Sequence, residues 1–153
     1  MPIPKNRSKS SCDIGRMKIL LHSFPKFGKS TWASTIPDSI FLATEPGLGC
    51  IDAMRWEDEK GNYVIDTWAK LMEATSEVVK AGCFKTVIID TLDMALEMCK
   101  DHICAAAGEK YHTDGTLGYG KGSAMIIAEM RRYLVRLGAI NMGVVLLSHT
   151  VQG

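Results

Sequence analysis

The sequence predicts an α/β domain with a mainly parallel sheet and helices on both faces of that sheet. Short apolar runs typical of buried strands alternate along the chain with segments in which apolar residues recur at helical spacing. The segment 84–90 is the clearest strand, because an unbroken run of Val-Ile-Ile leads into an aspartate. A chain of 153 residues with 46% apolar residues can bury one hydrophobic core, so one domain is expected over 17–153.

The first half of the sheet is expected from two apolar segments. Residues 17–22 read Met-Lys-Ile-Leu-Leu-His and stop at a turn-like Ser-Phe-Pro, which is typical of a buried strand. A helix over 30–36 follows and ends before Pro37. Residues 39–44 form a second strand that a Glu-Pro-Gly turn closes, and residues 47–66 have a loop-like pattern.

The next helix is marked at both ends. Thr67 can cap its N-terminus, and Gly82 lies just past its C-terminus. Its apolar face comprises Trp68, Leu71, Met72, Val78 and Val79. After the strand over 84–90, helical spacing of apolar residues recurs up to about residue 107. That spacing joins Leu92, Leu96, Cys99 and Ile103.

The last third of the chain contains a loop, a helix and a strand. Residues 108–122 are rich in glycine and polar side chains, so a loop is expected there. A helix then begins at Ser123 and ends before Gly138. Its apolar side comprises Ile126, Met130, Leu134 and Leu137, and its polar side comprises Arg131, Arg132 and Arg136. The last strand covers 143–148, and because the chain stops soon afterwards, we expect a domain truncated at its C-terminus.

Charge and composition exclude several classes of function. Lysine and arginine number 18 and aspartate and glutamate 17, so no overall field attracts nucleic acid or an anionic membrane, and such a partner needs a local patch. The longest apolar stretches are far shorter than the roughly 20 residues of a membrane span, so we expect no membrane partner. Residues 1–16 are expected to form a flexible arm without a signal-peptide core, which indicates a cytoplasmic protein.

The five cysteines are irregularly spaced and contain no Cys-x-x-Cys pair, so we expect reduced thiols rather than a zinc or redox site. One grouping, Cys99, His102 and Cys104, has the residue types of a metal site. On a helix Cys99 and His102 share a face while Cys104 turns away, which argues against zinc.

A phosphate-binding loop for Mg-ATP is predicted between the first strand and the first helix. It comprises Ser23, Phe24, Pro25, Lys26, Phe27, Gly28, Lys29 and Ser30. In such a loop Gly28 lets the backbone approach the phosphates, Lys29 reaches the β- and γ-phosphates, and Ser30 ligates Mg²⁺. Thr31, one step into the helix, is placed to meet the α-phosphate. Ser23 stands where glycine is usual in this motif, and the alternative of an ordinary Gly-Lys-Ser turn stays open.

A magnesium-nucleotide site also needs a carboxylate at the end of a neighbouring strand. Asp90 follows the apolar run of the central strand and has that position, so we expect it to hold Mg²⁺ through a metal-bound water. The alternative is that Asp90 only caps the helix that begins at Thr91 and Leu92.

Hydrolysis requires a base or a water-orienting group near the γ-phosphate. Thr91 stands directly after Asp90, where many ATPases have a glutamate, so the carboxylate must come from elsewhere. Glu45 ends the second strand and should face the same edge of the sheet as Lys29. We therefore predict Glu45 as the base, with Asp93 as a weaker candidate. A solvated Glu45 in a Pro-Gly turn is the alternative.

Four sequence blocks carry a resemblance to a known family. They are Phe-Pro-Lys-Phe-Gly-Lys-Ser-Thr (24–31), Phe-Leu-Ala-Thr-Glu-Pro-Gly-Leu (41–48), Val-Ile-Ile-Asp-Thr (87–91) and Leu-Leu-Ser-His (146–149). In this order they resemble the phage-encoded nucleotide-binding AAA ATPases of RecA-like fold. The resemblance spans 17–150 and implies a RecA-like P-loop NTPase domain over 17–153, located in the host cell cytoplasm.

The resemblance also implies roles for individual residues and partners. The glutamate after the second strand is the catalytic carboxylate of that family, which agrees with Glu45. A polar pair that ends the last strand senses the γ-phosphate, and Ser148 and His149 have the matching position, although His149 replaces the glutamine of RecA itself. Lys29, Glu45 and His149 thus form the predicted catalytic set, with a strand-end histidine of no function as the alternative for His149. Several members act as homo-oligomers on single-stranded DNA.

The loop over 113–122 corresponds by resemblance to the first DNA-contacting loop of RecA-like proteins. Tyr119 can stack on a base and Lys121 can meet a phosphate, so these two residues are the candidate contacts to single-stranded DNA. One aromatic residue and one lysine also fit a plain connecting loop, and that alternative stays open. The three arginines of the last helix are either charge-stabilising fingers for a neighbouring subunit or its solvated face.

Three functions follow as hypotheses. The first is Mg-ATP hydrolysis by a RecA-like ATPase that acts on single-stranded DNA in recombination or replication. The second is a nucleotide-dependent switch that binds a protein partner and has little ATPase activity. The third, a small-molecule kinase, is disfavoured because no arginine-rich lid follows the central strand.

Overall fold

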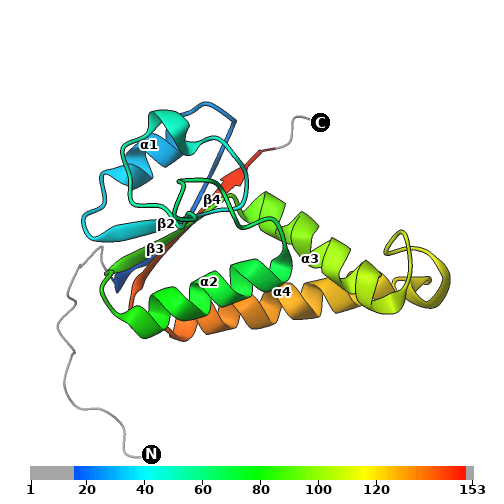
Figure 1. Cartoon of the computed structure of the whole chain (residues 1–153). Coiled ribbons are helices and arrows are strands. Elements are labelled where there is room, and N and C mark those ends of the chain that lie inside the picture. The colour runs from blue at the N-terminus through cyan, green and yellow to red at the C-terminus, as the bar shows by residue number, and fades with distance from the viewer. Residues whose placement is uncertain (1–15, 151–153) are drawn as a thin grey trace, which may run out of the picture.

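A sheet of four parallel strands, in the order β1-β4-β3-β2, forms the centre of the domain (Figure 1). The computed structural model describes residues 16–150, so the expected arm over 1–16 lies outside the described residues except for Arg16. The strands are β1 (Lys18–Ser23), β2 (Ser39–Ala43), β3 (Thr86–Asp90) and β4 (Gly143–His149). Each neighbouring pair is parallel, which confirms the predicted α/β class and its parallel sheet.

Four α-helices connect the strands. They are α1 (Lys29–Ser34), α2 (Trp68–Ala81), α3 (Leu92–Ala107) and α4 (Lys121–Ala139), and two short 3₁₀ helices cover η2 (Leu48–Cys50) and η3 (Gly115–Leu117). The predicted signals at the ends of α2 are confirmed. The Thr67 hydroxyl accepts a hydrogen bond from the Lys70 backbone N–H, and Gly82 takes the left-handed conformation with φ of 62° that glycine adopts without strain.

Two helix predictions need correction. Helix α4 begins at Lys121 rather than Ser123, because Gly120 in the left-handed conformation starts it and its carbonyl accepts the Ala124 N–H (3.0 Å). The buried face of α4 contains Tyr133, whereas Leu134, which the spacing assigned to that face, is 37% exposed. Helix α1 ends at Ser34, two residues before the predicted end, because the next N–H groups bond three residues back.

The sheet separates two hydrophobic clusters. Helix α1 covers one face of the sheet, and α2, α3 and α4 cover the other (Figure 1). Strand β3 is buried on both sides, since Ile88 packs toward α1 while Val87 and Ile89 pack toward the other three helices. The cluster on the α1 side comprises Ala33, Ile36, Phe41, Ala43, Leu48, Ile88, Val145 and Leu147. Two-sided coverage follows from the continuous apolar character of the strands.

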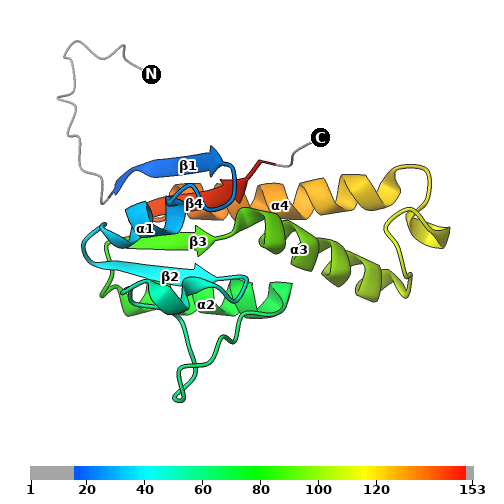
Figure 2. The ribbon, with the colours of Figure 1, turned by 90° about the horizontal axis from the view of Figure 1, so that it is seen from above.

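Helices α3 and α4 form an antiparallel hairpin that projects past the carboxyl edge of the sheet (Figure 2). The connection between them, residues 108–120, lies at the tip of that hairpin. Within α3, Cys99 and Cys104 are buried while His102 is exposed. Across residues 16–150, none of the helices combines the length and the apolar character that a membrane crossing needs.

Candidate phosphate-binding site

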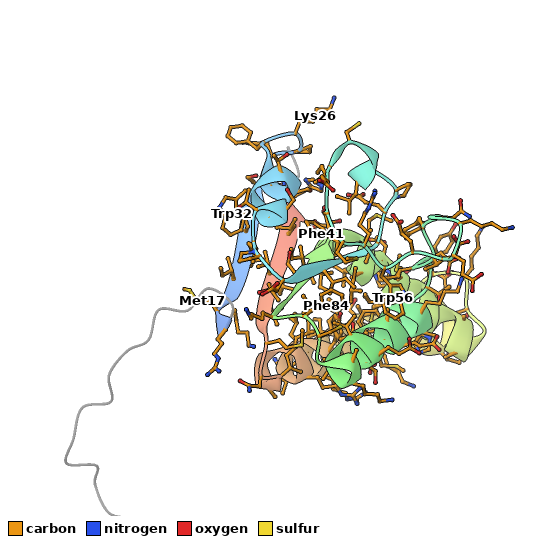
Figure 3. All side chains as sticks on the ribbon, turned by 60° about the vertical axis from the view of Figure 1, so that its left-hand side comes forward. Met17, Lys26, Trp32, Phe41, Trp56 and Phe84 are labelled. Carbon is orange, nitrogen blue, oxygen red and sulfur yellow. The ribbon has the colours of Figure 1, made fainter. Side chains whose placement is uncertain are left out.

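The predicted phosphate loop connects β1 to α1 at the carboxyl edge of the sheet. Two of its residues are left-handed, Lys26 with φ of 64° and Gly28 with φ of 80°. Left-handed residues interspersed in a turn direct successive N–H groups to one side, which forms a concavity for an anion. The Lys26 side chain points away from the domain at the outer rim of this loop (Figure 3), so it does not occupy the concavity.

Lys29 is buried inside the loop, with 6% of its surface exposed. Its ammonium group donates to the carbonyl oxygens of Ser23 (3.0 Å) and Phe24 (2.9 Å) and contacts His149 Nδ1 at 3.0 Å. These partners are formally neutral acceptors, and no ion pair joins Lys29 to a carboxylate within residues 16–150. A buried cation without a carboxylate partner favours an anionic ligand.

Ser30 and Asp90 join the loop to the end of β3. The Ser30 hydroxyl donates to Asp90 Oδ2 (2.6 Å). Burial raises the pKa of the Asp90 carboxyl above its usual 3.8, and the Ser30 hydrogen bond and the electrostatic effects of His149 and Lys29 act in the opposite direction. Thr91, not Asp90, is the N-cap residue of α3, so Asp90 is directed to the loop rather than to capping that helix.

The oxygen atoms at this position fit Mg²⁺. A hydroxyl and a carboxylate are hard donors, and Mg²⁺ takes few protein ligands because phosphates and water complete its shell. Within residues 16–150, no group of three or more His, Cys, Asp or Glu side chains is arranged to hold a metal ion. The buried Thr91 hydroxyl, next in sequence to Asp90, has no hydrogen-bond partner among the described residues.

Glu45 and Lys29 lie on opposite sides of the His149 imidazole. His149 Nδ1 lies 3.0 Å from Lys29 Nζ, and His149 Nε2 lies 3.6 Å from Glu45 Oε1. Because the lysine can only donate, Nδ1 is the accepting nitrogen and Nε2 carries the proton that faces Glu45. The Glu45 side chain is 37% exposed, so water reaches it. The structure therefore brings the three residues of the predicted catalytic set together at one edge.

Asp93, the weaker candidate for the base, holds the end of β4. Its carboxylate accepts the His149 backbone N–H (2.7 Å) and the Ser148 hydroxyl (3.1 Å). Ser148 Oγ also lies 3.0 Å from His22 Nδ1, and His22 Nε2 lies 3.2 Å from the Thr150 hydroxyl. These contacts fix the backbone of His149 and leave its imidazole directed to Lys29 and Glu45.

A cavity borders Glu45, and the sequence analysis assigned no role to the residues of its far wall. It encloses about 250 Å³ between the turn after β2 and residues 55–63, with Arg55, Trp56 and Tyr63 in its lining. Arg55 is held by Glu57 Oε1 (3.0 Å) and donates to the Leu48 carbonyl (3.0 Å). The signal in the sequence is a turn with Gly61 between two aromatic residues, which is typical of a hairpin.

The candidate DNA contacts lie at the tip of the α3–α4 hairpin. Tyr119 is fully exposed and has a φ of 54°, which is rare for a residue with a side chain. Lys121 was predicted to lie in the loop. It is instead an exposed residue of the first turn of α4, because this helix starts two residues earlier than expected. Leu117, two residues before Tyr119, is buried, so the connection is anchored on the core. Helix α3 has 16 residues, so the tip lies about 24 Å from Asp90 along its axis.

A family model described as an AAA domain matches residues 16–152. Among curated proteins, no match to the chain is found. The matched segment contains the phosphate loop, Asp90, Glu45 and the polar end of β4.

Proposed function

The chain belongs to the AAA domain family, and from this premise we propose that it binds Mg-ATP at residues 23–30 and hydrolyses it to ADP and phosphate. The observation that carries the proposal is the meeting of Lys29, the Ser30–Asp90 pair and Glu45 at one edge of the sheet. A cation, a pair of hard oxygen donors and a partly exposed carboxylate are the groups that phosphoryl transfer to water requires.

Phosphate binding uses the loop and its lysine. The N–H groups of the loop surround the phosphates, and Lys29 Nζ exchanges the carbonyl oxygens of Ser23 and Phe24 for β- and γ-phosphate oxygens. Ser30 and Asp90 are the residues that hold Mg²⁺, Asp90 through a water molecule. When bound, Mg²⁺ would neutralise charge on the phosphates. The exposed Thr31 is placed to meet the α-phosphate.

Hydrolysis uses Glu45 as the base. Glu45 accepts a proton from a water molecule whose oxygen bonds to the γ-phosphorus, while the bond from that phosphorus to the bridging oxygen of ADP breaks. Lys29 stabilises the charge that develops on the transferred group. His149, between the two residues, registers whether a γ-phosphate is present, because the phosphate competes with it for Lys29.

The wider role that we propose is a RecA-like one: a homo-oligomer that acts on single-stranded DNA in phage recombination or replication, in the host cell cytoplasm. Its support is the family resemblance of the four sequence blocks, together with the exposed Tyr119 and Lys121 at a hairpin tip on the side of the phosphate loop. Arg131 and Arg136 of α4 are exposed as well, and they are the side chains to test for a contribution to a neighbouring subunit.

The test is steady-state ATP hydrolysis with paired substitutions. Lys29→Ala should abolish nucleotide binding and turnover, whereas Lys80→Ala, an exposed lysine on α2, should leave both unchanged. Glu45→Gln should retain Mg-ATP binding and lower kcat by about 10²- to 10⁴-fold, the usual contribution of a general base. The matched control is Glu59→Gln in the exposed turn. Wild-type protein that binds no ATP would contradict the proposal.

The DNA component is measured separately. Single-stranded DNA should raise kcat, and Tyr119→Ala should weaken DNA binding by about 1–3 kcal/mol if the ring stacks on a base. Lys121→Ala should reduce the slope of log affinity against log salt by about one phosphate contact. ATP binding with negligible turnover that ignores DNA would instead favour the nucleotide-dependent switch that binds a protein partner.

A further inference from the structure

The Thr44 hydroxyl joins the ends of β2 and β3. Thr44 is 1% exposed and lies directly after the last residue of β2. Its hydroxyl donates to the Thr91 carbonyl (2.7 Å) and also accepts the Thr91 backbone N–H (2.7 Å). Its own N–H donates to the Asp90 carbonyl (2.8 Å). One buried side chain therefore satisfies both backbone groups of a residue that is 47 positions away in sequence.

The position of this clamp matters because of its sequence neighbours. Thr44 directly precedes Glu45, and Thr91 directly follows Asp90. The last aligned pair of the β2–β3 ladder is Ala43 and Asp90, so regular pairing stops where the two carboxylate-bearing segments begin. Beyond that point the Thr44 hydroxyl continues the connection in place of the backbone ladder. It thus fixes the backbone that carries the base relative to the backbone that carries the metal-directed carboxylate.

The clamp also reaches α3. The Thr91 carbonyl accepts the Ala95 N–H (3.2 Å), so the same group that bonds Thr44 starts the helix. The Thr91 hydroxyl takes no part in capping α3. Loss of the Thr44 hydroxyl therefore leaves the Thr91 N–H without an acceptor and frees the segment at Glu45 from the start of α3.

We propose that Thr44 is a positioning residue for hydrolysis, which acts through Glu45 and touches neither nucleotide nor metal. The inference rests on the proposed function. A displacement of a reacting group by about 1 Å can lower the rate by roughly 100-fold, so loss of the clamp should lower kcat by about 10- to 100-fold. Nucleotide affinity should stay nearly constant, because none of the hydrogen bonds of the clamp involves residues 23–30, and Asp90 keeps its own hydrogen bond to Ser30.

The experiment compares Thr44→Val with Thr44→Ser in the full chain. Valine replaces the hydroxyl with a methyl group of similar size, and serine keeps the hydroxyl. We measure kcat for ATP, the Kd of Mg-ADP, and the thermal unfolding midpoint for each. Thr44→Val should lose kcat at an unchanged Kd, and Thr44→Ser should recover most of it. Thr44→Cys, with a weaker donor and acceptor, should fall between them and carries the test if the valine variant does not fold.

A cycle with Glu45→Gln separates positioning from a general structural effect. If Thr44 acts through Glu45, Thr44→Val should lower the residual rate of the Glu45→Gln protein by less than about 2-fold, since interacting sites are non-additive. An equal loss in both backgrounds, or a wild-type kcat in folded Thr44→Val, would overturn the inference while leaving ATP hydrolysis intact. Absence of Lys29-dependent hydrolysis in the wild-type chain would overturn the proposed function itself, and the inference with it.

Discussion

Replacing Asp93 with alanine removes the carboxylate that holds the end of β4 on the first turn of α3. Asp93 accepts the His149 N–H at 2.7 Å and the Ser148 hydroxyl at 3.1 Å. The loss of a charged acceptor for a half-buried N–H costs about 1.5–3 kcal/mol. In the variant, the Ser148 hydroxyl still has His22 Nδ1 as a partner at 3.0 Å, so its lost bond to Asp93 adds little to that cost.

A second contribution comes from the position of Asp93 in the helix. It is the acidic residue in the first turn of α3, where a negative charge contributes about 0.3–1 kcal/mol. Together the two effects predict a loss of about 2–4 kcal/mol in the free energy of unfolding. For a chain of this size each kcal/mol lowers Tm by roughly 2–4 °C, so the midpoint should fall by at least about 4 °C.

Urea unfolding followed by circular dichroism measures this loss, with Asp101→Ala as the matched control. Asp101 is an exposed aspartate on the same helix, and its substitution should change stability by less than about 0.5 kcal/mol. Asp93→Asn keeps one carbonyl acceptor and should lose about half as much as alanine. An Asp93→Ala protein as stable as Asp101→Ala would refute the argument that this carboxylate anchors β4.

Two further predictions concern a buried charge and two helix glycines. Burial raises the pKa of Asp90, so as pH rises the unfolded chain loses the Asp90 proton before the folded chain does. The free energy of unfolding of the wild type should therefore fall relative to that of Asp90→Asn as pH rises from 3.8 through the raised pKa. Denaturant unfolding without Mg²⁺ measures this difference. Gly122→Ala should destabilise by about 1–3 kcal/mol because its Cβ would overlap the His112 carbonyl, whereas Gly138→Ala, with open space, should stabilise by about 0.5–1 kcal/mol in thermal melts. The first expectation is contradicted if Asp90→Asn has no higher free energy of unfolding than the wild type at pH 7. The second is contradicted if Gly122→Ala and Gly138→Ala change stability equally.

The sequence predicts the elements that local patterns determine. The apolar run before Asp90 identifies β3, and the Thr67 and Gly82 signals delimit α2, because strands and helix caps depend on neighbouring residues. The predicted start of α4 was wrong because it relied on local composition alone. Gly120 and Gly122 predict a loop by composition, yet Gly120 opens the helix and Gly122 is required where the helix passes the His112 carbonyl.

Contacts between distant segments were beyond such patterns. Asp93 resembles any acidic residue in a first helical turn, and its bond to the His149 N–H depends on β4 lying next to β3. Thr44 likewise resembles a strand-end threonine, and its clamp depends on the β2–β3 register. The grouping of Glu45 with Lys29 at one edge of the sheet was predictable, because the carboxyl ends of parallel strands meet at the same edge. The family resemblance placed His149 in the same catalytic set, but the position of its ring directly between Lys29 and Glu45 did not follow from the sequence.

If Glu45 is the base, as we propose, it follows a strand other than that of Asp90, and this has a structural consequence. A glutamate directly after Asp90 would be positioned by one covalent link, whereas Thr91 stands there and Glu45 follows β2. The distance between the proposed base Glu45 and the proposed metal residue Asp90 then depends on the contacts that hold β2 against β3. Two contacts hold the turn that carries Glu45: the hydrogen bond of the Thr44 hydroxyl to Thr91, and the hydrogen bond that Arg55 donates to the Leu48 carbonyl. Substitutions at these supports should therefore lower kcat more than they weaken nucleotide binding, whereas substitutions in the loop around Lys29 should weaken binding first.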